Sequence, residues 1–282
     1  MLRLKARANK LAIPASDFHD EESERSARCG EFVWQIVKQL GGELCFRSSA
    51  DISNAQLLAV ALDFCGLPST NSPTWQIAFT RDPNQPIIVP DVLVHFSHTE
   101  DYIHYFRQAK SMVGNVYSAF KASRRGKSQS YRQELEFMQT QLIRETFMPR
   151  FNLSLNPPLD DLFNYLGENA QREFTVALTR VLKHSKEPLN FFKSTQLREY
   201  PFLYINASLM AADIFFYPQT SPSASLSTDF FIVASVLPYV DILATDGHIS
   251  QLIKRAGLGH RYQAKVFSMK GRHALMNEIA NL

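Results

Sequence analysis

Residues 229–247 read DFFIVASVLPYVDILATDG, and this stretch determines how the fold of the chain is interpreted. Its first part, 229–239, has the apolar spacing of a buried helix. Its second part, 240–245, is an apolar run of strand length that ends directly before Asp246. A helix and then a buried strand are therefore predicted here.

The same alternation of elements continues to the C-terminus. Residues 248–256 place apolar side chains on one helical face, and Gly257 can end that helix in a left-handed conformation. A further strand is expected at 264–268, followed by a last helix. Near the N-terminus, residues 11–14 form another short apolar run. Alternating strands and helices predict an α/β fold with a mostly parallel sheet covered by helices.

The middle of the chain lacks this alternation. From about residue 96 to residue 224 the sequence is interpreted as mainly helical. We therefore expect a single domain, 1–282, that is built from an N-terminal part, 1–95, and a C-terminal part, 225–282. The residues between these parts, about 96–224, are expected to form a long helical insertion.

Composition limits the classes of protein. Hydrophobic residues make up 45% of the 282 residues, which is enough for a substantial core. A net charge of +3 and a pI of about 8.7 permit a nucleic-acid partner without requiring one. The three cysteines show no disulfide or zinc spacing, and no signal peptide or membrane-spanning run is seen. A cytoplasmic protein with no membrane partner is expected.

Three acidic residues are expected near strand ends. In parallel α/β sheets, ligands bind at the carboxyl ends of the strands. Asp246 follows strand 240–245, Asp229 opens the preceding helix, and Glu22 lies in the first turn of the helix after strand 11–14. Carboxylates are ligands that suit Mg²⁺ or Mn²⁺. Each acid also has an ordinary structural explanation, as a helix cap, a turn residue or part of a solvated acidic turn.

Two segments together resemble a bacterial group of PIN-like (PilT N-terminus-like) ribonucleases. Residues 229–247 resemble its C-terminal signature, in which an Asp opens a helix, a Leu-Pro-Tyr-x-Asp turn follows, and a strand ends in Thr-Asp. The earlier segment LAIPASDFHDEE resembles an apolar strand followed by Ser-x-x-His-x-x-Glu, with Ser16, His19 and Glu22 at the named positions. The match covers roughly residues 1–50 and 225–270.

The resemblance implies a three-layer PIN-like fold and a specific chemistry. Glu22, Asp229 and Asp246 would be the catalytic and metal-site acids, and the reaction would be hydrolysis of RNA phosphodiester bonds by metal-activated water. His19 would contact the substrate. Asp241 is expected to be structural, because it lies at the start of the strand whose other end carries Asp246.

One element of the PIN-like pattern is missing from the sequence. Members of the group begin with a strand that ends in an Asp, and no such strand precedes residues 11–14. We therefore expect either that this strand lies upstream of Met1, or that the chain is a degenerate member. The alternative function is then a non-catalytic protein that binds RNA or another protein.

Residues 119–133 form a basic stretch that is a second candidate for RNA contact. Lys121, Arg124 and Arg125 would contact phosphates, and Phe120 and Tyr131 could stack on bases. A solvated loop between helices explains the same composition. The sequence does not indicate an oligomeric state.

Overall fold

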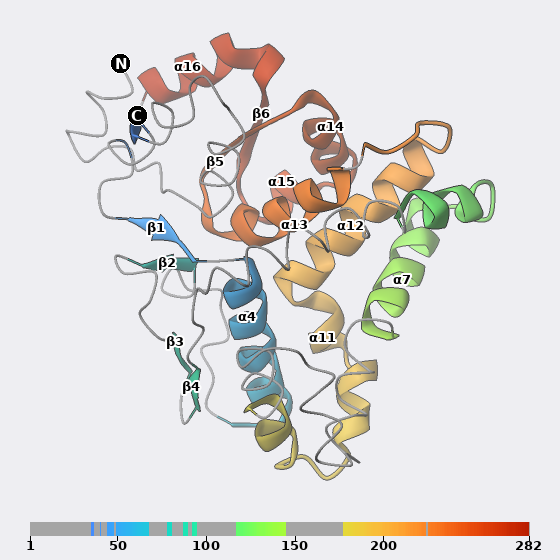
Figure 1. Cartoon of the computed structure of the whole chain (residues 1–282), viewed down its shortest axis with the longest axis vertical. Coiled ribbons are helices and arrows are strands. Elements are labelled where there is room, and N and C mark those ends of the chain that lie inside the picture. The colour runs from blue at the N-terminus through green and yellow to red at the C-terminus, as the bar shows by residue number, and fades with distance from the viewer. Residues whose placement is uncertain are drawn as a thin grey trace. The chain divides into compact units, whose positions relative to one another are not determined.

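A computed structural model describes residues 35–36, 40, 44–47, 49–67, 78–80, 87–89, 92–94, 117–144, 177–223 and 225–281. Helices dominate these residues (Figure 1). The described residues fall into two compact units. The first unit draws on 1–52, 74–85 and 235–282, and the second draws on 53–73 and 86–234. The predicted single domain with an insertion stays a prediction.

The predicted three-layer α/β fold with a mostly parallel sheet is wrong, because the described part of the chain is mostly helical. Its strands form three separate pairs, of which only one is parallel. The antiparallel pairs are β1 (Cys45–Phe46) with β2 (Phe79–Thr80), and β3 (Ile87–Val89) with β4 (Val92–Val94). Two residues separate β3 from β4, whereas a parallel crossover needs about a dozen or more.

The parallel pair lies in the C-terminal part of the first unit, where the predicted order of elements is found. β5 (Ile242–Thr245) runs parallel to β6 (Lys265–Ser268) in a register that pairs Ile242 with Lys265 and Thr245 with Ser268. The connection between them contains α14 (Gly247–Arg255) and α15 (Leu258–Arg261). η4 (Met269–Gly271) and α16 (Arg272–Ala280) follow β6.

Local sequence signals explain where these elements begin and end. Asp246 is the N-cap of α14, and Gly257 has the left-handed φ of 68° that was expected after that helix. The helix buries Ile249, Leu252 and Ile253, which lie at helical spacing on one face. Burying these three side chains stabilises α14 against the strand pair by several kcal/mol, at roughly 1.5–3 kcal/mol each.

The second unit is built from helices around α12 (Pro201–Phe216). Eleven of the 16 residues of α12 are buried, so it has no solvent-facing stripe and occupies the core. α7 (Tyr131–Leu142) runs alongside it, as Figure 1 shows. The other described elements of this unit are the β3–β4 pair, most of α4 (Ser49–Phe64), helical residues 117–124 and 177–182, η2 (Pro188–Lys193), α11 (Thr195–Glu199) and most of α13 (Leu226–Val236).

The ends of α4 and α13 refine the sequence-based boundaries. α4 begins at Ser49, and Gly66 follows it with a left-handed φ of 67°. α13 begins at Leu226, three residues before the predicted start at Asp229. In the part of the chain that the structure describes, no helix is long and apolar enough to cross a membrane.

Candidate functional site

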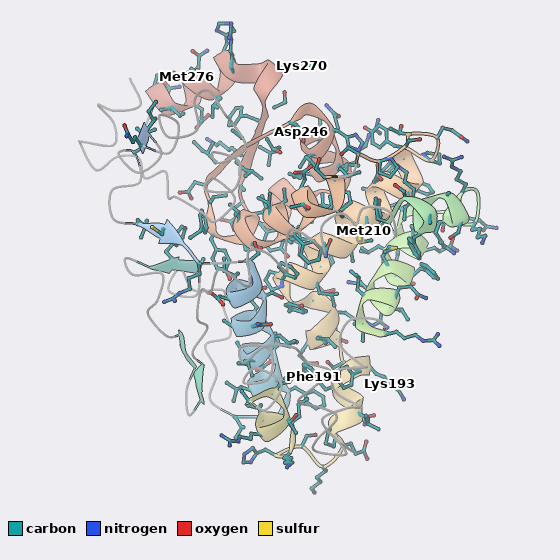
Figure 2. All side chains as sticks on the ribbon, viewed as in Figure 1. Phe191, Lys193, Met210, Asp246, Lys270 and Met276 are labelled. Atoms are coloured by element: carbon teal, nitrogen blue, oxygen red, sulfur yellow. The ribbon has the colours of Figure 1, made fainter. Side chains whose placement is uncertain are left out.

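Asp246 lies at the carboxyl end of β5, where the sequence places a site residue. Its Oδ1 accepts hydrogen bonds from the backbone N–H groups of His248 at 2.7 Å and Ile249 at 2.9 Å. Figure 2 shows its position at the start of α14. The side chain is exposed, and both bonds use the same oxygen. Asp246 is therefore an N-cap that fixes the orientation of its carboxylate while one oxygen serves the cap.

Asp241 lies at the opposite end of the same strand. It directly precedes β5, and its backbone carbonyl accepts a 2.8 Å hydrogen bond from the N–H of Lys265. This bond extends the pairing of β5 with β6 by one step. The expected position of Asp241 at the start of the strand is confirmed. Its backbone carbonyl contributes to strand pairing.

Of the other two predicted acids, the structure describes Asp229. Asp229 lies half-buried in the first turn of α13, on the second unit, and its N–H donates to the carbonyl of Ser225 at 3.0 Å. Glu22 and His19 lie outside the described residues. Among the described residues, no three His, Cys, Asp or Glu side chains gather to hold a metal ion. The convergence of the three acids stays a prediction.

Lys121, from the basic stretch 119–133, is buried in the second unit. Its side chain is 2% exposed, and its Nζ lies 2.7 Å from Oδ2 of Asp213, which is fully buried on α12. The hydroxyl of Tyr117 donates to the same oxygen at 2.7 Å. Lys121 therefore neutralises a buried carboxylate, and this contact occupies its ammonium group.

Arg124 serves a second buried carboxylate. Its guanidinium makes a two-point ion pair with Glu134 on α7, with Nη2–Oε2 at 2.8 Å and Nε–Oε1 at 3.1 Å. The hydroxyl of Ser128 also donates to Glu134. The guanidinium carbon lies 3.7 Å from the ring centroid of Phe137, an arrangement that adds a cation–π contact. The exposed cations of the stretch are Arg125, Lys127 and Arg132.

The aromatic residues of the basic stretch also have partners within the fold. Phe120 stacks on Phe137 with 6.1 Å between centroids, and Tyr131 stacks on Phe216 at 5.6 Å. Burial raises the pKa of Tyr131 to about 12. Burial, followed by the nearby charge of Asp213, raises the pKa of Tyr117 well above its ordinary value. Both phenols are therefore neutral hydrogen-bond donors at physiological pH.

Sequence reasoning did not identify Asp213 and Glu134 as the partners of these cations. One signal was present, because Asp213 interrupts the apolar run of α12 and a buried charge requires an opposite charge. No comparable signal marks Glu134, because α7 is amphipathic and carries several charged residues. Its partner could be found only from the packing of the helices.

The donor chemistry of the predicted acids fits a hard divalent cation. Carboxylate oxygens are preferred by Mg²⁺ and Mn²⁺, and Asp246 presents an exposed, oriented carboxylate. The local geometry of Asp246 fits the role of such a ligand. No family model matches the sequence, and no curated protein or solved structure is significantly similar to it, so the resemblance to PIN-like ribonucleases rests on the two sequence motifs.

Proposed function

We propose that the chain is a divalent-metal-dependent ribonuclease of the PIN-like kind that hydrolyses RNA phosphodiester bonds in the cytoplasm. The observation that supports this proposal is the position of Asp246, an exposed and oriented carboxylate at the carboxyl end of a strand in a parallel β5–α14–β6 unit. The two motifs in residues 11–22 and 229–247 support the same activity. The proposal requires this local unit and does not require the three-layer fold.

Glu22, Asp229 and Asp246 are the residues that would hold Mg²⁺ or Mn²⁺. Such an ion supplies charge neutralisation at the phosphodiester and lowers the pKa of a bound water. At this position the chain contributes by orienting the carboxylate of Asp246. Two backbone N–H groups fix Oδ1, so the carboxylate plane is set by the first turn of α14.

The second candidate is a non-catalytic protein that binds RNA or another protein. One observation favours it, because the two N–H groups at the start of α14 already give Asp246 a structural role without any ion. In this case the carboxylate would matter for helix capping alone. The two candidates therefore make different predictions for a substitution that keeps the cap and removes the charge.

Asp246→Asn is that substitution, because Asn caps helices about as well as Asp. The experiment incubates the full chain with fluorescent single-stranded RNAs in Mn²⁺ or Mg²⁺, with EDTA as the metal-free control. The proposed function predicts cleavage that requires metal and that falls by about a hundredfold or more in Asp246→Asn. Asp241→Asn, at the other end of β5, is the matched control and should retain cleavage. An inactive parent chain with all RNAs and both metals would favour the non-catalytic candidate.

A further inference from the structure

The positive charge of the chain is concentrated in its last 42 residues. The whole sequence has 30 Lys and Arg against 27 Asp and Glu. Residues 241–282 contain six of the bases and three of the acids, a difference of +3. The remaining 240 residues therefore hold 24 bases and 24 acids, and their formal charge is zero. An excess of cations confined to one segment is typical of a surface that meets a polyanion.

Part of this excess lies at the same sheet edge as Asp246. Thr245 pairs with Ser268 at the ends of the two parallel strands, so the residues that follow each strand leave from one edge. Asp246 follows β5, and a cation cluster follows β6. This cluster consists of Lys270 and Arg272, both exposed; Figure 2 labels Lys270 and Asp246. Neither residue forms an ion pair with another described residue.

The cluster is placed where it opposes the stability of its own helix. α16 begins at Arg272, and its first turn contains no acid and no side-chain cap. The N-terminus of a helix carries partial positive charge, so cations there are unfavourable. α14 follows the ordinary rule, with Asp246 at its N-terminus and Lys254 and Arg255 in its last turn. A local rule that is broken on an exposed surface indicates a role other than stability.

We propose that the cation cluster Lys270 and Arg272 binds the phosphate backbone of single-stranded RNA beside Asp246. This inference rests on the proposed function, because it names the surface that would hold the substrate at the candidate site. Contact with phosphates explains the exposure of the cluster, its lack of acidic partners among the described residues and its unfavourable position at the start of α16. The carboxylate of Asp246 adds one negative charge at the same edge.

The test measures binding of the full chain to a fluorescein-labelled oligouridine by fluorescence anisotropy, in EDTA and over a series of salt concentrations. Lys270→Gln/Arg272→Gln should weaken binding roughly tenfold, and the slope of log Kd against log salt should fall by about 1.4, which corresponds to two phosphate contacts on a single strand. The same variant should melt at an equal or higher temperature than the parent, because unfavourable charge leaves the start of α16.

The matched control is Lys254→Gln/Arg255→Gln, which changes the charge of the same unit by the same amount at the last turn of α14. This control should bind RNA like the parent and melt at a lower temperature. Equal weakening in both variants, unchanged binding in Lys270→Gln/Arg272→Gln, or no RNA binding by the parent would each overturn the proposal. Because EDTA prevents metal-dependent cleavage, these results are independent of the hydrolysis assay, and the two proposals can fail separately.

Discussion

The basic residues of the C-terminal strand pair and two of those in residues 117–142, Lys121 and Arg124, occupy opposite environments. Around β5 and β6 the cations are exposed, and Lys270 and Arg272 have no acidic partner among the described residues. Around α7 and α12, Lys121 and Arg124 lie against fully buried carboxylates. The two regions look alike in sequence, because each is a short stretch rich in Lys and Arg.

The difference teaches that a basic stretch predicts a nucleic-acid surface only when its charges are not already used inside the protein. A buried carboxylate such as that of Asp213 must be paired, so its partner is a structural residue. An exposed cation at a helix N-terminus has no such structural explanation. Lys121 and Arg124 are therefore explained by their buried partners, whereas the RNA contact predicted for the exposed Arg125 stays a prediction. The segment after β6 is the further RNA contact that we propose.

Lys121→Met should produce the largest loss of stability. It leaves the carboxylate of Asp213 buried with the phenol of Tyr117 but without its cation, a change that costs about 3–5 kcal/mol in comparable cases. Urea unfolding of the purified chain would measure this loss. The double variant Lys121→Met/Asp213→Asn removes both charges, keeps an acceptor for Tyr117, and should recover a large part of the stability. A single variant as stable as the parent would contradict the structural role of Lys121.

Arg124→Lys should cause a smaller loss, of about 1–2 kcal/mol. Lysine keeps the positive charge near Glu134 but cannot form the two-point contact, and it loses the planar stack on Phe137. The same exchange at Arg125, which is exposed, provides the control and should leave the urea midpoint unchanged. Equal urea midpoints for both variants would show that the two-point contact with Glu134 contributes nothing to stability.

Asp246→Ala should cost about 1 kcal/mol, because it removes the acceptor of two N–H groups at the start of α14. Asp246→Asn should change the stability by only a few tenths of that amount. Thermal melts of both variants at low salt would measure the difference. A loss in Asn as large as that in Ala would mean that the charge, rather than the capping hydrogen bonds, stabilises this end of α14.

Tyr131→Phe should have the smallest effect at neutral pH, since its phenol makes only a long 3.4 Å bond to the carbonyl of Ser208. A raised pKa stabilises the fold below the unfolded value near 10, and this stabilisation is lost as pH rises toward the folded value of about 12. The phenylalanine variant should therefore lose less stability than the parent between about pH 10 and pH 12. If the melting temperatures of the variant and the parent fell equally with rising pH, Tyr131 would not be the source of this pH dependence.

The sequence predicted the elements of the C-terminal strand pair and failed on the overall architecture for a physical reason. Asp246, Gly257 and the apolar face of α14 are local signals that act within a few residues, so their outcome can be derived from sequence. Extending that parallel alternation to the whole chain was the error. Strand pairing elsewhere depends on connections such as the two residues between β3 and β4, which permit antiparallel pairing alone.

The candidate site was predictable only in part. The position of Asp246 at a strand end followed from the alternation of elements, and the cap explained its local geometry. The buried partners of Lys121 and Arg124 lie 92 and 10 residues away in sequence. No periodic pattern in the sequence indicates which helices pack together to form these pairs. The cation cluster after β6 was visible as composition, but its exposure and its place beside Asp246 required the register of the strands.

Hydrolysis of single-stranded RNA by Asp246→Asn, measured on the same preparation as its thermal melt, tests the central claim most directly. The proposed function predicts a variant that melts like the parent and whose cleavage rate in Mn²⁺ is lower by about a hundredfold or more. A variant that melts like the parent and cleaves at the parent's rate would contradict the assignment of Asp246 to the reaction and leave it as a helix cap.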